Sequence, residues 1–547
     1  TYTMESVELN NKTIERAGIG YEKIICVIAF ILAVMAAAWL RFDQIGLKPF
    51  HHDEGVNSHF LLKLANNGEY KYNPENYHGP TLYYIALLAL RIFGETDLAL
   101  RFTPALFGVL TVLMVWFLRK HLGPIGTPVA AFLLALSPGL VYFSRDFIHE
   151  MSFGCFSLGV VVGAWRYAES KNFSWLALMA ASAGLLFATK ETAIITVVVM
   201  IIAAICAAAW DIKRRLEMTR DILPASIARE FRRDWEGVAP SRDHLLAAVM
   251  IFVFINVFFY SSFFTNWKGV PDAIKSIFLW TGRSGSEHKK EFLYYIGILL
   301  KLELPLLVGS LLAGIFIVRK GTRFWLFTGA WTLGITLAYS IIGYKTPWLM
   351  ISFLVPAAIL SGYAAQRVYS ASPLLWIRLL WVAALVVVLI FNYRMARTVN
   401  FEKYDDNSNG SGYLTGFRRD LDLIPNDDGL YGYVYAQTDR NIFDLIQAIK
   451  TETDKLPSGA NTPIYAATPE YWPLPWYMRV YPQAGFSGGL PSAEGGPPQI
   501  SQPIIIANMS QQSILNDMPG WRILPQTFTL RPGQTLVIYV RDDAEQR

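Results

Sequence analysis

A short stretch early in the chain, residues 48–55, gathers the side chains best suited to acid–base chemistry. Its sequence Lys-Pro-Phe-His-His-Asp-Glu-Gly places two histidines directly before Asp53 and Glu54. Neighbouring residues on a helix point about 100° apart, so the two carboxylates are expected to have different tasks. A carboxylate that is partly withdrawn from water can have its pKa raised toward the range of a general base. This stretch is the first candidate for a reaction site.

Three more charged residues stand at or inside the ends of apolar runs: Arg101, Asp146 and Lys190. If Asp146 faces the stretch that holds Asp53, it supplies a second carboxylate. Lys190 separates two apolar runs, where a lysine can either snorkel toward water or hold a phosphate as a point charge. Arg101 lies four residues into its run, which is a costly place for a charge, so it is expected to have a partner.

A divalent metal is the alternative use of the histidine-rich stretch, with His51, His52 and Asp53 as its ligands. The spacing of these residues matches no recognised zinc signature. The prediction is therefore that no metal or other cofactor is required, and that the histidines act as hydrogen-bonding groups.

The elements that must position these residues are mostly apolar. Of the 547 residues, 53% are hydrophobic and 17% are charged, against roughly 25% charged in an average soluble protein. This composition excludes a disordered, collagen-like or ordinary cytosolic chain. The net charge of +5 is small for this length and argues against nucleic acid as a partner. The three cysteines lie in or beside apolar runs and are expected to pack as small hydrophobes without disulfides.

Eleven apolar runs are predicted to cross a membrane. They lie near residues 19–40, 97–118, 124–143, 151–168, 174–189, 193–210, 244–262, 292–318, 324–342, 347–366 and 374–393. The apolar segment Pro80–Phe93 has only 14 residues, which suits an interfacial helix better. With eleven spans the basic loops share one side, which the positive-inside rule assigns to the cytoplasm. The largest, 211–243, contains eight Lys and Arg residues and is expected to be a solvated connector.

The opposite, extracytoplasmic side then holds the candidate residues. It comprises the first outer loop 41–96, several short loops and the tail, so that residues 1–399 form a transmembrane domain and 400–547 a soluble one. Six of the eight histidines fall on this side together with the acids, which indicates a single reaction site. Further candidates for substrate contacts on this side are His52, Arg145, Glu150 and Lys345.

The tail returns to the composition of a soluble protein. Short strands are predicted at 431–436, 463–467, 503–507 and 535–540, helices at 441–450 and 511–516, and a Gly/Pro/Ser-rich loop at 485–503. The aromatic run 471–477 is expected to pack in a core or interface. The predicted fold is a polytopic α-helical membrane protein with a small C-terminal α/β domain.

An acid–base cluster on the outer side requires a substrate that is activated without ATP or nucleotide sugars, because these are cytoplasmic. A polyprenyl-phosphate sugar meets this requirement. Its tail can lie among the spans, its phosphate can meet a lysine or arginine, and a carboxylate can deprotonate an acceptor hydroxyl.

Several motifs give the sequence a resemblance to a known group of enzymes. The Asp-Glu pair follows the first span, and the segments that accompany it are His-Gly-Pro-Thr-Leu-Tyr-Tyr (78–84), Arg-Phe-Thr-Pro-Ala-Leu-Phe-Gly (101–108), Ala-Thr-Lys-Glu-Thr-Ala (188–193), Tyr-Lys-Thr-Pro-Trp-Leu (344–349) and Tyr-Trp-Pro-Leu-Pro-Trp-Tyr (471–477). This ordered set resembles the GT-C membrane glycosyltransferases, in the branch of protein O-mannosyltransferases and lipid A aminoarabinose transferases. Within that branch it is most similar to a bacterial and archaeal family.

The resemblance implies an inverting glycosyl transfer from a polyprenyl-phosphate sugar to a lipid, glycan or protein acceptor at the outer face of the cytoplasmic membrane. By this resemblance Asp53 activates the acceptor, Glu54 supports it and Asp146 is the second acid. Lys190 and Arg101 would bind the donor phosphate. The chain departs from the aminoarabinose enzymes at 76–80, where Glu-x-Lys-Pro is replaced and His78 would substitute in part.

Two other classes of membrane protein remain as alternatives. A transporter of lipid-linked glycans is disfavoured because the sequence shows no inverted repeat and, apart from Lys301 and Glu303, no charged residue deep in a span. A non-catalytic accessory subunit of a membrane complex is the other, since a fold can persist after its activity is lost.

Overall fold

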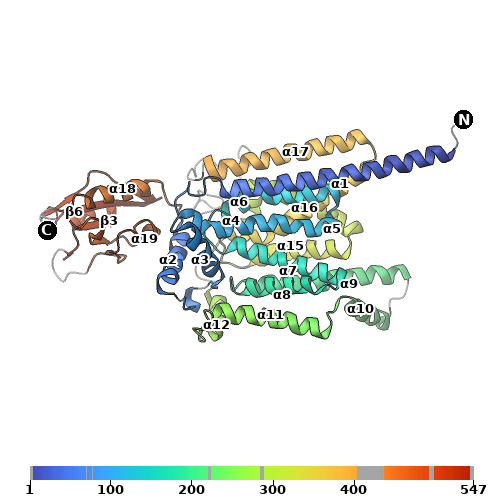
Figure 1. The fold of residues 1–547 in the computed structure, drawn as a ribbon, viewed down its shortest axis with the longest axis horizontal. Coiled ribbons are helices and arrows are strands. Elements are labelled where there is room, and N and C mark those ends of the chain that lie inside the picture. The colour runs from blue at the N-terminus through green and yellow to red at the C-terminus, as the bar shows by residue number, and fades with distance from the viewer. Residues whose placement is uncertain are drawn as a thin grey trace.

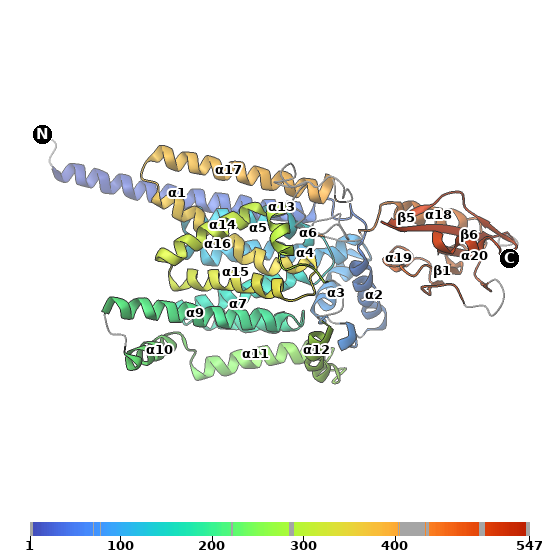
Figure 2. The same ribbon diagram turned by 180° about the vertical axis from the view of Figure 1, so that it is seen from behind.

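The computed structural model consists of a bundle of long helices with a small β-sheet at one end (Figures 1 and 2). It describes residues 4–68, 70–76, 78–219, 223–283, 289–402, 404, 433, 437–491 and 498–542. The N-terminal end of the first helix lies at the end of the bundle opposite the sheet. The predicted fold class, a polytopic helical membrane protein with a small C-terminal α/β part, is confirmed.

The bundle is built from long helices that run along the long axis of the molecule. They are α1 (Met4–Phe42), α4 (Asp97–Met114), α5 (Arg119–Leu136), α7 (Glu150–Ser170), α8 (Phe173–Phe187), α9 (Ala193–Thr219), α11 (Arg242–Tyr260), α14 (Leu304–Lys320), α15 (Arg323–Ile341), α16 (Ile351–Ala371) and α17 (Leu375–Arg397). Shorter helices near the sheet end are α2 (His52–Asn67), α3 (Thr81–Phe93), α6 (Pro138–Phe143), α12 (Gly269–Arg283) and α13 (Tyr294–Leu302). One further helix, α10 (Pro224–Val238), lies at the opposite end.

The continuous helical stretch from α4 to α5 contains a reversal of the chain. Gly123 has φ 76° and ψ 179°, a conformation that glycine adopts without steric cost. Arg101, near the start of α4, donates to the Lys48 carbonyl just after α1, and Ala135, near the end of α5, accepts from Arg41 in the last turn of α1. The two halves are therefore antiparallel, as the sequence predicted with separate runs at 97–118 and 124–143.

The predicted run 292–318 is broken. α13 and α14 meet at an angle of 108° at Glu303, and Pro305 follows in the first turn of α14. Glu303 is fully buried, where its carboxylate accepts hydrogen bonds from the Ser137 hydroxyl at 2.7 Å and the Gly139 N–H at 2.8 Å. The backbone of Glu303 is not helical (φ −129°, ψ 30°), and Pro305 has no N–H to continue the ladder of helical hydrogen bonds, which explains the difference from the prediction.

By length and composition, seven helices in the described parts of the chain can cross a membrane, or eight if the bent pair is one span. The chain is thus a multi-pass membrane protein. The stretch from α4 to α5 counts once in this total, and α7 and the 15-residue α8 do not enter it. All eleven predicted runs are largely helical, but a total of eleven spans stays a prediction.

The basic loops gather at the end of the bundle opposite the sheet. Lys171 donates to the Ala239 carbonyl, Arg214 donates to the Gly321 carbonyl, and Arg323 pairs with Asp234. The segment 211–243 is more structured than the solvated connector that was predicted. α9 continues to Thr219, and α10 follows. Glu230 and Asp234 of α10 form ion pairs with Arg215 and Arg323, which hold this helix against the bundle and which a count of charges does not show.

The main core of the bundle forms where α5 packs against α16. A Cβ atom added to Gly362 would lie 2.5 Å from the Gly126 carbonyl oxygen and 2.7 Å from the Ala130 side chain. Close approach of helices at small residues is the usual way in which membrane helices associate, because lipid supplies no hydrophobic force between them. α16 is accordingly buried over most of its length.

The tail contains a mixed six-stranded sheet with the order β2-β1-β3-β6-β4, in which β5 also pairs with β6. The strands are β1 (Ile464–Ala466), β2 (Ala484–Phe486), β3 (Ile504–Asn508), β4 (Trp521–Ile523), β5 (Phe528–Arg531) and β6 (Gln534–Arg541). β1 is parallel to β2 and β3, and the pairs with β6 are antiparallel. Alternate residues of β3 enter separate cores on the two faces of the sheet, so this strand is buried throughout.

Most predicted tail elements are confirmed. The strands predicted at 463–467, 503–507 and 535–540 correspond to β1, β3 and β6, and the two helices to α18 (Asn441–Thr453) and α20 (Gln512–Leu515). β2 occupies the first residues of the loop that was predicted from 485. The strand predicted at 431–436 lies outside the described residues apart from Tyr433.

The contact between α5 and α16 gives a stability prediction. Gly362→Ala should lower the thermal midpoint of the purified protein, because overpacking a tight site costs about 1–3 kcal/mol. Gly314→Ala in α14 is the matched control, since its added Cβ would meet no atom within 4 Å. That change should leave the midpoint unchanged or raise it, because alanine is the better helix former. Equal effects of the two substitutions would contradict the packing argument.

Candidate active site

The site begins at the first turn of α2, which follows α1 in the chain after a short loop. The His51 ring accepts a hydrogen bond from the Asp53 N–H at 3.3 Å, and the Glu54 carboxylate accepts one from the His51 N–H at 2.9 Å. This reciprocal pair is a capping box that fixes the start of the helix. As predicted, Asp53 and Glu54 differ in environment, because Glu54 is fully buried and Asp53 is half-buried.

Glu54 is saturated by hydrogen bonds. Its carboxylate accepts from Arg101 Nε at 2.7 Å, Arg101 Nη2 at 2.8 Å and the Phe147 N–H at 2.8 Å, in addition to His51. Burial alone would raise the pKa of Glu54, but Arg101 reverses this and holds it below the ordinary value. Glu54 is therefore an ionised structural group that joins α2 to α4 and to the loop before α7.

Arg101 has no donor left for a phosphate. Besides the two bonds to Glu54, Nη1 donates to the carbonyls of Ile45 at 2.7 Å and Lys48 at 2.9 Å, and Nη2 donates to Pro49 at 3.3 Å. A guanidinium has five N–H donors, and all five are used. The partner expected for this costly charge is thus Glu54, and the geometry makes Arg101 a positioning residue for the loop 45–49.

Asp146 is brought to the same place by Lys48. The two side chains form an ion pair in which both are almost fully buried, and the Lys48 ammonium lies 3.4 Å from the centre of the Tyr142 ring. Burial lowers the pKa of Lys48 to about 8 and raises that of Asp146, although each partner opposes the shift of the other. Lys48 was not among the predicted site residues, and its only signal was its position at the head of the stretch 48–55.

A second buried ion pair joins Lys190 to Glu150. Lys190 Nζ donates to Glu150 Oε1 at 2.5 Å, with 8% and 7% of the side chains exposed. Burial would lower the pKa of Lys190, but Glu150 raises it on balance, so the lysine is a stable cation. Lys190 does not extend toward water as a snorkelling residue would.

Pairing between two loops places His78 beside this lysine. His78 forms an antiparallel bridge with Lys190, and Gly79 N–H donates to the Thr189 carbonyl at 3.0 Å. A Cβ on Gly79 would lie 2.0 Å from the Ala188 carbonyl oxygen, so only glycine permits this approach. The His78 ring is about one-third exposed and lies 3.8 Å from the Glu191 carboxylate.

His149 completes this part of the site. Its ring centre lies 4.7 Å from that of His78, and its buried Nε2 has no hydrogen-bond partner in the part of the chain that the structure describes. Burial, together with His78 and Lys190, places the pKa of His149 well below the ordinary value. It is a neutral imidazole, and it too was absent from the predicted set.

Arg145 and Lys345 bond to the backbone. Arg145 caps the end of α1 by donating to the carbonyls of Leu40 at 3.0 Å and Asp43 at 2.6 Å, and also to Gln44. Lys345 donates to the carbonyls of Ile342 at 2.6 Å and Lys290 at 3.1 Å. Their roles in substrate binding stay predictions. The contacts described here hold the ends of neighbouring chain segments in place.

The tail closes over the start of α2. Trp476 stacks on Phe50 with ring centres 5.2 Å apart and donates to Asp97 Oδ1 at 3.0 Å. A Cβ on Gly55 would lie 2.7 Å from the Pro473 side chain, so the aromatic run rests directly on this helix. The prediction that the run packs in an interface therefore agrees with the structure.

His52 lies under the same cover. Its ring meets the Trp472 ring edge-on at 6.4 Å, and Arg531 from β5 is held by the Trp472 carbonyl at 2.6 Å. Burial lowers the pKa of His52, although Asp53 opposes this. The tail thus supplies part of the surroundings of the half-buried Asp53.

No group of three His, Cys, Asp or Glu side chains within the described ranges is placed to hold a metal ion. In the stretch considered for a metal, the His51 ring is committed to the helix cap. The dependence on a metal or cofactor stays a prediction.

Part of the chain is similar in sequence to known proteins. Residues 77–222 match the family described as dolichyl-phosphate-mannose-protein mannosyltransferase. A stretch of 171 residues, 29% of this chain, is 30% identical to an uncharacterized protein of Aquifex aeolicus (strain VF5) and covers 34% of that protein. The chain therefore spans about a third of the length of this curated relative.

Two solved structures are similar over most of the chain. One is ArnT from Cupriavidus metallidurans bound to undecaprenyl phosphate, with a TM-score of 0.60, 14% identity, and coverage of 94% of this chain and 97% of that one. The other is the archaeal oligosaccharyltransferase AglB from Archaeoglobus fulgidus with an inhibitory peptide and a dolichol-phosphate, with a TM-score of 0.54, 12% identity, and coverage of 89% and 70%. The chain has the fold of the GT-C membrane glycosyltransferases, as its motifs predicted.

The role of Arg101 can be tested by substitution. Arg101→Met leaves the Glu54 carboxylate buried without its partner, which should destabilise the protein by about 3–5 kcal/mol. The double variant Arg101→Met/Glu54→Gln removes the unpaired charge and should recover part of the lost thermal stability. Arg91→Met, at an exposed arginine of α3, is the control. Undiminished stability of Arg101→Met together with loss of polyprenyl-phosphate binding would instead make Arg101 a phosphate ligand.

Proposed function

We propose that the protein is a glycosyltransferase that transfers a sugar from a polyprenyl-phosphate carrier to an acceptor hydroxyl, with inversion at the anomeric carbon. The observation that carries this proposal is the state of Asp53. No described residue donates a hydrogen bond to its carboxylate, whereas that of the adjacent Glu54 is saturated. A half-buried carboxylate that a helix cap holds in place, and that receives no hydrogen bond from the described protein groups, is suited to accept a proton from a substrate.

Glycosyl transfer from a phosphate donor also needs positive charge beside the phosphate, and two buried lysines can provide it. Lys190 is paired with Glu150, and Lys48 with Asp146. A lysine has three N–H donors, so one carboxylate contact leaves hydrogen-bonding capacity. His78 is the partly exposed side chain beside Lys190 and is placed to add a contact.

The reaction balances with these groups. The acceptor O–H gives its proton to Asp53, and the oxygen forms a bond to the anomeric carbon from the side opposite the phosphate. The bond between that carbon and the phosphate oxygen breaks, and polyprenyl phosphate leaves with the electron pair. Lys190 stabilises the developing negative charge, which is the kind of preorganised electrostatic contribution that dominates many enzymes.

The candidate site lies on the extracytoplasmic side of the membrane in this proposal. The candidate residues lie at the sheet end of the bundle, and the basic loops at the other end. By the positive-inside rule the sheet end faces away from the cytoplasm. We propose the cytoplasmic (inner) membrane as its location. ArnT, whose fold this chain shares, was crystallised with undecaprenyl phosphate, and AglB with a dolichol-phosphate, which supports a polyprenyl-phosphate donor. The acceptor is a lipid, a glycan or a protein.

Substitution of the proposed base tests the catalytic role. Asp53→Asn should lower turnover by about 10²- to 10⁴-fold, the usual share of general-base catalysis, while binding of polyprenyl phosphate stays near that of the wild type. The assay incubates the purified protein with a panel of radiolabelled polyprenyl-phosphate sugars and measures release of polyprenyl phosphate. Asp444→Asn, at an exposed residue of α18, is the control. Wild-type turnover of Asp53→Asn with an inactive Asp146→Asn would move the base to Asp146.

A second test separates phosphate binding by Lys190 from mere neutralisation of Glu150. Lys190→Met should weaken polyprenyl-phosphate binding by about 1.5–3 kcal/mol, the range for a hydrogen bond to a charged group. The double variant Lys190→Met/Glu150→Gln should remain equally weak. Recovery of binding in the double variant would show that Lys190 only compensates Glu150. Lys63→Met, at an exposed lysine of α2, should bind like the wild type.

A further inference from the structure

Helix α10 turns polar side chains toward the protein and leaves large apolar side chains exposed, which is the opposite of a surface helix in a soluble protein. The residues that face the protein are polar: Ser226 is buried, and Glu230 and Asp234 are half-buried. The exposed residues include a row of large apolar side chains, namely Leu223 (64% exposed), Ile227 (43%), Phe231 (43%), Trp235 (65%) and Val238 (37%). These recur every three or four residues, so they form one apolar stripe along the helix.

The polar face is fixed to the bundle by ion pairs. Asp234 contacts Arg215 of α9 and Arg323 of α15, each at 2.8 Å, and Glu230 lies 3.5 Å from Arg215. These contacts determine the rotation of α10 about its own axis. The apolar stripe therefore lies at the side of α10, where its side chains stay 37–65% exposed and some of them face α9 without forming a packed core.

A third face of the helix carries charge. Arg229, Arg232, Arg233 and Glu236 are exposed, and together they carry a formal charge of +2, from three arginines and one glutamate. At about 100° per residue these positions lie on the side of the helix opposite the apolar stripe. The helix thus has an apolar side and, opposite to it, a positively charged side, and a third face between these two contacts the bundle.

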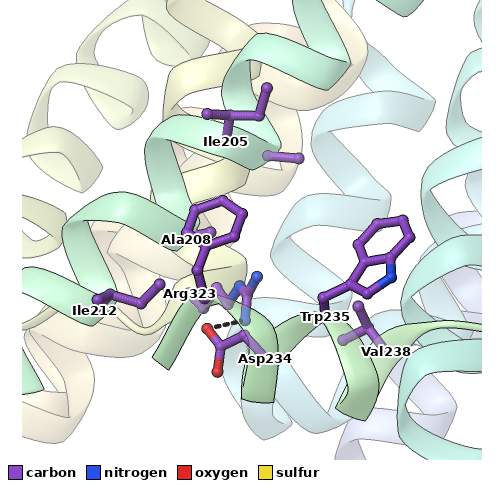
Figure 3. Close-up of a pocket in the computed structure, with 9 residues that line it drawn as sticks. Ile205, Ala208, Ile212, Asp234, Trp235, Val238 and Arg323 are labelled. Carbon is purple, nitrogen blue, oxygen red and sulfur yellow. Dashed lines mark hydrogen bonds and ion pairs between the residues drawn. The ribbon is translucent and has the colours of Figure 1, made fainter. Parts of the chain in front are cut away.

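The position of α10 agrees with a membrane boundary. It connects α9 with α11, two helices that are long and apolar enough to span a membrane, and it lies at the end of the bundle where the basic loops gather (Figures 1 and 2). Below it is an apolar cavity of about 200 Å³ between α9 and α10 (Figure 3). Ile205 and Ile212 from α9 and Trp235 and Val238 from α10 line it, and the Asp234–Arg323 pair forms its polar side.

We propose that α10 is an interfacial helix that lies in the surface of the lipid leaflet at this end of the bundle, with glycerophospholipids as its partner. The acyl chains cover the apolar stripe and enter the cavity beside α9, while the exposed arginines meet headgroup phosphates. Lipid explains the stripe because the charged face on the other side requires water, and only a membrane surface offers both along the length of one helix. This inference does not depend on the proposed glycosyl transfer.

The test uses probes at neighbouring positions with opposite surroundings. Single cysteines replace Phe231 or Arg232 in a Cys206→Ala background, because Cys206 is the exposed native cysteine, and each is labelled with the fluorophore NBD. The full-length protein is placed in lipid nanodiscs, which leave both membrane faces open to an aqueous quencher. The second pair, Trp235→Cys and Glu236→Cys, repeats the comparison in case one variant folds poorly. Cys206→Ala alone gives the background labelling.

The expected result is opposite quenching within each pair. Lipids with a nitroxide on the acyl chain should quench the probes at 231 and 235 at least twofold more than those at 232 and 236, and aqueous iodide should show the reverse order. Equal access of iodide to both members of a pair would place the helix in water and overturn the proposal. Protection of the 231 and 235 probes from both quenchers would also overturn it, because a second protein surface would then cover the stripe.

Discussion

The ion pair between Glu54 and Arg101 is the contact on which the arrangement of the candidate site depends. It joins the first turn of α2, the N-terminal part of α4, the loop 45–49 and the backbone of Phe147 through hydrogen bonds of 2.7–3.3 Å. A buried carboxylate and a buried guanidinium are each costly, and they are tolerated only when all their hydrogen bonds are made. That requirement fixes four chain segments relative to one another.

One consequence is a division of labour between adjacent acids. Because the Glu54 carboxylate makes the contacts that hold these segments together, the carboxylate of the half-buried Asp53 receives no hydrogen bond from any described residue. The aromatic run of the tail packs against its neighbours His52 and Gly55. The same fixed loops carry Lys48 toward Asp146, and the pairing of His78 with Lys190 brings a second lysine and Glu150 to the same end of the bundle. The site is thus assembled from loops, but buried polar contacts give each loop a defined position.

Charged side chains are kept away from lipid in different ways at the two ends of the bundle. At the sheet end, charged side chains are withdrawn from lipid by pairing with each other and with backbone carbonyls. At the other end α10 holds Glu230 and Asp234 against basic side chains of the bundle and leaves its large apolar side chains exposed. Both arrangements follow from the same rule, that a charge avoids hydrocarbon unless it is paired.

The sequence alone determined the helical membrane class, the GT-C resemblance, three of the six strands of the tail and the stretch that contains Asp53. Apolar length, alternation and local motifs are properties of neighbouring residues, so these features can be found without a structure. The sequence alone could not show which side chains contact one another in the folded protein. That Glu54 and Arg101 satisfy each other, that Lys48 belongs to the site, that the run 292–318 bends at Glu303 and that α10 leaves its apolar stripe exposed are decided by contacts between residues far apart in the chain. Only the tertiary structure brings those atoms within bonding distance, and hydrogen-bond saturation then distinguishes a structural charge from one that is free to react.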